Sequence, residues 1–114
     1  MEQLSHEKLD VYQFAIELLA VLSQIAHGLP PGYAFIADQL KRAAISIPLN
    51  IAEGAGKQTP KDKKRFYGYA RGSALECGAI VDCCYTMKII TQRQVESVKL
   101  KIIQVVKILS KLAR

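Results

Sequence analysis

Apolar residues recur at helical spacing along almost the whole chain, and no stretch alternates with the two-residue period of a strand. In the first such segment, spacings of four and three residues connect Val11, Ala15, Leu18, Leu22 and Ile25. This pattern predicts a helix from Ser5 or His6 to His27, with Gly28 as a left-handed cap. Because few polar residues interrupt the segment, most of its surface must be covered by other helices.

The same periodicity predicts three more helices, over residues 34–53, 60–89 and 92–113. Pro48 lies inside the first of these, but the apolar pattern continues beyond it, so we expect a kinked and continuous helix. In the helix over 60–89, the predicted core row is Phe66, Ala70, Ser73, Cys77, Ile80, Cys84 and Met87. Four helices of about 20–30 residues with short connections predict an all-α, antiparallel up-down-up-down four-helix bundle. We expect one domain, residues 1–114.

The last predicted helix carries more large apolar side chains than one bundle can bury. Its inward-facing seam consists of Val95, Val98, Ile102, Val105, Leu109 and Leu112. Leu100, Ile103 and Ile108 lie off this seam and are also large and apolar. Since exposed aliphatic side chains favour association, the sequence predicts that these three residues form an interface between copies of the chain.

Composition and charge shift the expected function toward a polyanionic partner. The chain has 114 residues, 50% hydrophobic and 23% charged, which suits one folded domain and excludes a multidomain protein. Residues 1–56 carry three basic and six acidic residues, a net charge of −3, whereas residues 57–114 carry thirteen basic and four acidic residues, a net charge of +9. Such asymmetry favours RNA, DNA or an anionic surface, although a solvated basic surface would account for it equally well.

Two clusters hold the excess positive charge. The first is predicted to contact phosphates and consists of Lys57, Lys61, Lys63, Lys64, Arg65 and Arg71. Tyr67 and Tyr69 lie within it and are candidates for stacking on bases, and a helix N-terminus adds its own positive end. A solvated helix face is an equally good interpretation. The second cluster, for which a solvated face is favoured, is Lys99, Lys101, Lys107, Lys111 and Arg114.

The sequence offers little that would support catalysis. His6 and His27 stand near opposite ends of one predicted helix, and no glutamate is followed three residues later by a histidine. Cys77 and Cys84 share a helix face and are expected to pack in the core, whereas Cys83 points elsewhere and is expected to be partly exposed. We therefore expect a non-enzymatic, cytoplasmic protein with reduced thiols and no metal, cofactor, small-molecule substrate or membrane segment.

A polar stripe crosses the otherwise apolar helix that contains Pro48. It consists of Arg42, Ser46, Asn50 and Glu53, at spacings of four, four and three residues. Arg42 is expected to pair with Glu76 or Glu53, and Asn50 to satisfy the carbonyl that Pro48 leaves free. A network between helices or subunits is favoured over a ligand site.

The same stripe belongs to a longer motif. The segment Arg42–Gly54, RAAISIPLNIAEG, resembles the signature of the four-helix-bundle proteins encoded in intervening sequences of bacterial large-subunit ribosomal RNA genes. Further matches are Leu9–Gln13, Arg65–Tyr67, Gly72–Ser73 and Glu76, so the resemblance covers nearly the whole chain. Tyr12 stands where tryptophan is common in that family.

This resemblance implies a left-handed antiparallel bundle that assembles as a ring, a homopentamer. A related group, the accessory variability determinant proteins of diversity-generating retroelements, forms similar barrels that bind nucleic acid and a reverse transcriptase. Neither relative implies a catalytic residue, and the motif positions are assigned to structure and assembly. Two functions remain open: a module that binds RNA or DNA with little sequence preference, and an interaction scaffold for an acidic protein or a reverse transcriptase.

Overall fold

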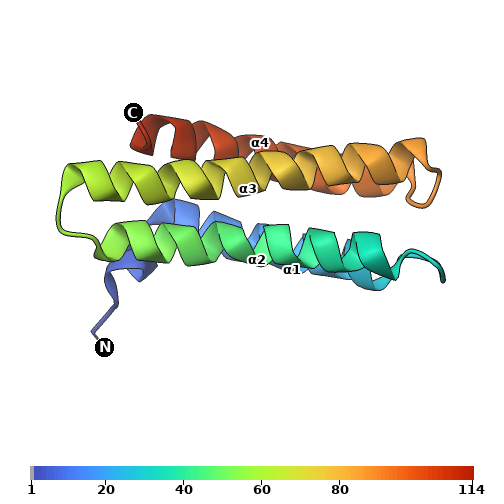
Figure 1. Cartoon of the computed structure of the whole chain (residues 1–114), viewed down its shortest axis with the longest axis horizontal. Coiled ribbons are helices and arrows are strands. Elements are labelled where there is room, and N and C mark those ends of the chain that lie inside the picture. Colours follow the sequence, from blue (N-terminus) through green and yellow to red (C-terminus); the bar gives the residue numbers. More distant parts are fainter. Residues whose placement is uncertain (1) are drawn as a thin grey trace.

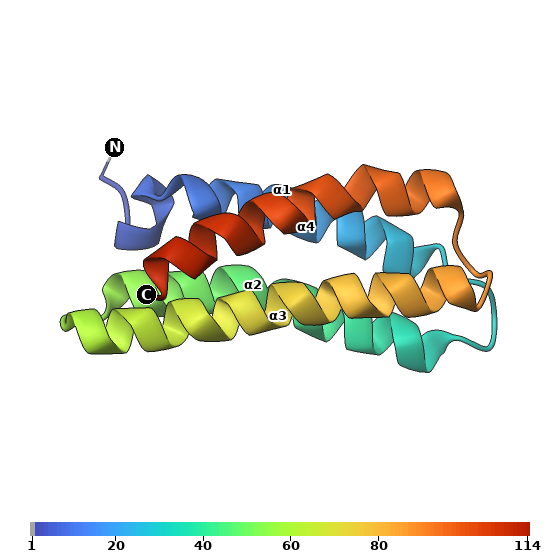
Figure 2. The same cartoon turned by 90° about the horizontal axis from the view of Figure 1, so that it is seen from above.

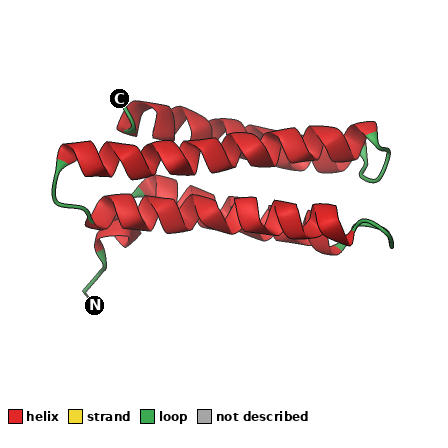
Figure 3. Cartoon of the chain, in the orientation of Figure 1, coloured by secondary structure: helices red, strands yellow, loops and turns green. Residues whose placement is uncertain are grey.

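The computed structural model describes residues 2–114, and all of its regular secondary structure is helical (Figures 1 and 3). The elements are a 3-10 turn, η1, and four α-helices: Ser5–Lys8 (η1), Asp10–His27 (α1), Ala34–Gly56 (α2), Pro60–Thr86 (α3) and Gln92–Leu112 (α4). No strand occurs within residues 2–114. The predicted all-α four-helix bundle is therefore confirmed.

Successive helices run in opposite directions, and both chain ends lie at the end of the bundle where α2 connects to α3 (Figures 1 and 2). α2 packs against α1 and α3, and α4 packs against α3 and α1. α1 and α3 therefore occupy one diagonal of the bundle, and α2 and α4 the other. It follows that the outer side formed by α3 and α4 is opposite the side formed by α1 and α2.

The core is aliphatic and contains no buried polar or charged side chain among residues 2–114. Its largest fully buried side chains come from α1, α2 and α4: Leu18, Leu22, Leu40, Ile47, Ile51 and Leu109. Burying each such side chain contributes about 1.5–3 kcal/mol. α3 supplies smaller side chains to the same core, namely Ala70, Ala74, Cys77, Val81 and Cys84.

The predicted core row of α3 is correct for only some of its residues. Tyr67 and Val81 are buried, whereas Phe66 and Ile80 are half-buried and Met87 is exposed. A helix of 27 residues drifts relative to a strict spacing of four and three, because an α-helix has 3.6 residues per turn. At several positions, the buried residue is therefore the sequence neighbour of the predicted one.

The chain does not enter α1 as one continuous helix from Ser5 or His6. Leu9 adopts an extended conformation, with φ −93° and ψ 126°, between the 3-10 turn and α1. The Glu7 carboxylate accepts the backbone N–H of Leu4 at 3.2 Å and closes the turn locally. Leu9 packs partly buried against the core, so burial of this side chain accounts for the break.

Two helix ends also differ from prediction. Gly28 follows α1 with φ −88°, and the left-handed residue of the α1–α2 connection is Gly32, with φ 95°. α3 ends at Thr86, before the predicted residue 89, because Lys88 has φ 63° and turns the chain. That turn directs Ile90 into the core, where it is 7% exposed. By contrast, α2 runs without interruption through the buried Pro48, as expected.

The start of α3 lies unusually close to the end of α2. A Cβ atom at Gly54 would lie 2.8 Å from Tyr67 Cε1 and 3.2 Å from the carbonyl oxygen of Lys63. Tyr67 is 7% exposed, and its burial raises the pKa of the phenol above the usual value. Glycine is therefore required at position 54 because the Tyr67 ring and the backbone of α3 occupy the space of a side chain.

We predict that Gly54→Ala lowers the free energy of unfolding by about 1–2 kcal/mol, because overpacking costs more than the gain in helix propensity. Gly56→Ala is the control, since nothing lies within 4 Å of a Cβ at that position. This variant should keep wild-type stability or gain slightly. Denaturant titrations followed by circular dichroism measure both effects. Equal stability of the two variants would contradict the proposed contact.

The three cysteines differ in accessibility in the predicted way. Cys77 and Cys84 are buried and Cys83 is exposed. Burial, together with the adjacent Glu76 carboxylate, raises the pKa of Cys77 to about 12. Burial, with Cys83 nearby, also raises the pKa of Cys84. A raised pKa leaves less of the reactive thiolate at any pH below it.

We predict that the folded protein reacts with one equivalent of a thiol-reactive disulfide reagent at mildly alkaline pH, and with three in denaturant. Cys83→Ser should abolish the reaction of the folded protein and leave two thiols in denaturant. A spectrophotometric thiol count distinguishes these outcomes. Rapid labelling of the folded Cys83→Ser variant would show that Cys77 or Cys84 is accessible.

Candidate nucleic-acid interface

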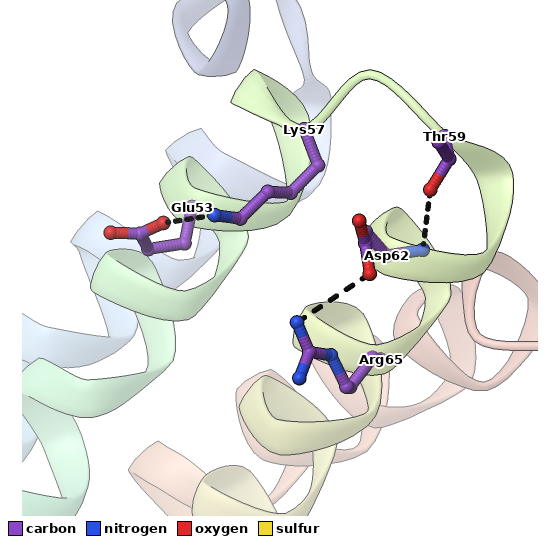
Figure 4. Close-up of polar contacts among 5 residues, drawn as sticks. All are labelled: Glu53, Lys57, Thr59, Asp62 and Arg65. Atoms are coloured by element: carbon purple, nitrogen blue, oxygen red, sulfur yellow. Dashed lines mark hydrogen bonds and ion pairs between the residues drawn. The ribbon is translucent and has the colours of Figure 1, made fainter.

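The α2–α3 connection places the first basic cluster at one end of the bundle. The Thr59 hydroxyl oxygen accepts the backbone N–H of Asp62 at 3.2 Å, and Pro60 occupies the first position of α3 (Figure 4). These residues begin the helix as the sequence predicts. The remaining free N–H groups of the first turn give this end of α3 a partial positive charge.

Three cations of this cluster bind groups of the α2–α3 connection and its flanking helix turns. Lys57 Nζ lies 3.5 Å from a Glu53 carboxylate oxygen, and an Arg65 nitrogen lies 3.5 Å from Asp62 (Figure 4). Lys63 Nζ donates to the carbonyl oxygen of Ala55 at 2.9 Å and so caps the last turn of α2. Lys57, Lys63 and Arg65 therefore serve the α2–α3 connection, and the charges of Lys57 and Arg65 are partly neutralised.

The aromatic residues of the cluster divide into one exposed and one buried tyrosine. Tyr69 is 51% exposed, and its ring meets the edge of Phe66 at 5.4 Å. The Lys57 ammonium and the Arg65 guanidinium each lie 4.9 Å from the centre of the Phe66 ring. The prediction that Tyr67 belongs to the binding surface is wrong, because its ring is buried against Gly54. Tyr69 remains available for stacking.

The other cations of the cluster lie toward α4. Lys61 and Lys64 are exposed and, within residues 2–114, have no acidic group within 4 Å. Arg71 Nε donates to the hydroxyl oxygen of Ser110 at 2.7 Å, a neutral partner on α4. This bond shows that the first half of α3 lies beside the last turns of α4.

The fold thereby brings the last cations of the second basic cluster toward the first cluster. The last turn of α4 lies beside Arg71, about three turns after the start of α3, and no acidic residue follows Glu96 in the chain (Figure 1). We call the combined surface the basic end; its residues are Lys61, Lys64, Arg71, Lys107, Lys111 and Arg114. All six side chains are exposed. The only acidic residue close to them in sequence is Asp62, which pairs with Arg65.

The polar stripe of α2 forms a network whose partners differ from those predicted. Asn50 donates its side-chain amide to the Ser46 carbonyl and hydroxyl oxygens, both at 2.9 Å, rather than to the carbonyl left free by Pro48. Ser46 in turn accepts the Ser73 hydroxyl at 3.0 Å and links α2 to α3. The stripe is therefore partly a helix-to-helix contact, as the sequence favours.

The charged members of that stripe, Arg42 and Glu53, face outward, and so does Glu76 on α3. Glu76 accepts the Gln39 side-chain amide at 2.7 Å, and Glu53 pairs with Lys57. The predicted pairs of Arg42 with Glu76 or Glu53 are therefore wrong within one chain. Arg42 is exposed and has no acidic group within 4 Å among residues 2–114.

The apolar residues predicted to lie outside the core separate into two groups. Leu100 is 75% exposed and Ile103 is 39% exposed, whereas Ile108 is partly buried against the core and does not contribute to an exposed surface. Exposed apolar side chains that were not predicted occur on α2, where Ile45 is 48% exposed and Leu49 is 58% exposed. Their spacing of four residues, outside the inward row of α2, is the signal that identifies them.

Within residues 2–114, no three side chains from His, Cys, Asp and Glu come close enough to hold a metal ion. No described helix is long and apolar enough to cross a bilayer. The described residues thus bring together cations and exposed apolar side chains, which suit binding to another macromolecule.

Comparison with known proteins agrees with the resemblance seen in the motif around Pro48. The chain matches the family described as 23S rRNA-intervening sequence protein over residues 7–111, which includes all four α-helices almost completely. No curated protein matches the chain. The family description names an intervening sequence of 23S rRNA and no activity. Because the match covers nearly its whole length, the chain belongs to the family of 23S rRNA-intervening sequence proteins.

Proposed function

We propose that this protein is a non-enzymatic, oligomeric helical bundle that binds RNA or DNA through its basic end, with little sequence preference. The observation that carries the proposal is a set of six exposed cations on the first half of α3, the last turns of α4 and the chain end after it, none with an acidic group within 4 Å among residues 2–114. A surface of this kind attracts phosphates because it releases the counterions condensed on the nucleic acid.

The chemistry of the basic end favours contact with the phosphate backbone over base recognition. Lysine side chains are flexible point charges, and four of the six cations are lysines. The exposed ring of Tyr69 lies on the same half of α3 and would stack on any base of a single strand. Binding should therefore weaken steeply with salt and differ little between sequences.

Self-association is the second part of the proposal. In the single chain, two helices expose large apolar side chains to water. These side chains are Leu100 and Ile103 on α4 and Ile45 and Leu49 on α2. A monomeric domain seldom retains several such groups on two sides, so we propose that copies of the chain cover them. The family resemblance points to a homopentamer.

An acidic protein, such as a reverse-transcriptase partner, is the alternative ligand for the same cations. Uncompensated positive charge also attracts carboxylate-rich protein surfaces. Affinity capture from lysate with and without nuclease separates the two cases. Retention of a stoichiometric partner after nuclease treatment, with no affinity for purified RNA or DNA, would favour the protein partner.

We predict that the double variant Lys61→Gln, Lys64→Gln binds labelled single-stranded RNA roughly tenfold more weakly at low salt and shows a smaller salt dependence. Neither side chain has an acidic group within 4 Å among residues 2–114, so replacing them should remove phosphate contacts directly. The control variant Lys41→Gln, Lys88→Gln has the same net charge but changes exposed lysines at the opposite end. Fluorescence anisotropy measures both. Equal weakening in the two variants would mean that net charge, and not the basic end, determines binding.

We also predict a solution mass several times 12.6 kDa by light scattering at micromolar concentration. Ile103→Gln should lower that mass because it removes an exposed apolar side chain, while the helix content seen by circular dichroism stays unchanged. A monomeric wild-type protein would contradict self-association. The measurement of nucleic-acid binding does not depend on that result.

A further inference from the structure

One exposed face of α2 carries charges at both ends and aliphatic side chains between them. Arg42, Ile45, Leu49 and Glu53 follow spacings of three, four and four residues, so they lie on one side of the helix. Their buried neighbours Ala44, Ile47 and Ile51 fix that side as the one opposite the core. We call this face the α2 ridge.

A groove on the outer side of α3 and α4 has matching features. It is lined by Leu75, Gly78, Ala79, Asp82, Lys99 and Ile103, together with deeper core side chains. Leu75 is 46% exposed. Arg71, four residues before Leu75, and Asp82, seven residues after Leu75, lie on the same side of α3. We call this face the α3 groove.

The two faces are complementary in charge and in spacing. Arg42 and Glu53 are eleven residues apart, and so are Arg71 and Asp82. Both intervals correspond to about 16 Å along a helix. Each face begins with a cation and ends with an anion, so two such helices attract one another when they run antiparallel.

We infer that the α2 ridge of one copy docks antiparallel into the α3 groove of a second copy, with Arg42 against Asp82 and Glu53 against Arg71. The inference rests on the proposed self-association and specifies its surfaces. In this register Leu49 meets Leu75, and Ile45 lies over the small side chain of Ala79. Large side chains thus face either each other or a gap between α3 and α4.

The glycines of α3 support the close approach of another helix from outside. Among residues 2–114, nothing lies within 4 Å of a Cβ atom placed at Gly72, so the fold of the single chain does not require glycine there. Glycine inside a helix destabilises it relative to alanine. In the proposed register Ala52 lies over Gly72, where absence of a side chain brings the two helices together.

The charges at both faces are free to change partners. Asp82 lies 3.9 Å from Lys99 and Glu53 lies 3.5 Å from Lys57, but the two carboxylate side chains are 66% and 59% exposed. Exposed pairs of this kind contribute little stability, about 0–1 kcal/mol. Arg42 has no acidic group within 4 Å among residues 2–114. Docking would provide it with a carboxylate.

The direction of the helices indicates how copies repeat. α2 and α3 of one chain are antiparallel, so a neighbour related by rotation about an axis along the bundle presents its α2 antiparallel to α3. The ridge and groove are different surfaces, so the contact is head-to-tail and each copy offers both. Such a contact leaves Lys61 and Lys64 of the basic end uncovered.

Cysteine crosslinking tests the register. In a Cys83→Ser background, the double variant Leu49→Cys, Leu75→Cys should form products larger than dimers with a short bifunctional thiol crosslinker, on a denaturing gel. Either single variant should stay uncrosslinked, because ridge and groove residues meet only each other. The buried Cys77 and Cys84 do not interfere.

Other packings would give different products. A dimer from Leu75→Cys alone would show that two α3 helices face each other, and a dimer from Leu49→Cys alone would show the same for α2. Either result overturns the proposal, as does an oligomer by light scattering with no crosslink from the double variant. A monomer by light scattering would instead remove the self-association on which the proposal rests.

Charge reversal provides the second arm of the test. Arg42→Glu and Asp82→Lys should each raise the dissociation constant of the oligomer about tenfold, because each brings like charges together. The combined variant Arg42→Glu, Asp82→Lys should restore the wild-type mass. Since both residues are exposed, circular dichroism should show unchanged folding. Additive weakening in the combined variant would overturn the pairing.

Discussion

The packing of α3 against the core determines most of what the surface of this protein presents. Ala70, Ala74 and Cys77 are completely buried, and side chains this small let α3 lie close to α2 and α4. Gly54 extends the same close packing to the end of α2, where the Tyr67 ring fills the space above it. Because protein interiors are close-packed, α3 has little freedom to rotate about its axis. Its outward residues are fixed by the same contacts.

This orientation divides the cations of α3 between two sides. On the side toward α2, Lys63 caps the last turn of α2 and Arg65 pairs with Asp62, so these two cations stabilise the α2–α3 connection. On the side toward α4, Lys64 has no carboxylate within 4 Å among residues 2–114, and Arg71 donates to Ser110. Net charge alone does not distinguish these sides. The unpaired charge is what a phosphate backbone would encounter.

The sequence was sufficient to predict the four helices and the continuity of α2 through Pro48, because each depends on local spacing. Tyr67 shows where local spacing is insufficient. Phe66 and Tyr67 are both aromatic, and only the drift of a long helix relative to its neighbours decides which is buried. The network of Asn50 likewise depends on Ser73, which belongs to another helix. Tertiary register, unlike helix formation, is not encoded within any one segment.

The proximity of α4 to the start of α3 is another consequence that spacing within a segment does not reveal. Lys107 and Lys111 resemble an ordinary solvated face in the sequence, and only antiparallel packing places the last turns of α4, which carry them, beside the first half of α3.

Rotation about an axis along the bundle keeps equivalent ends of all copies on one face of the assembly, so a head-to-tail ring would collect every basic end there. A nucleic acid crossing that face would meet several weak sites at high effective concentration. The modest affinity of a few lysines per copy would then become substantial, which explains physically why a bundle with a small basic surface would benefit from assembling.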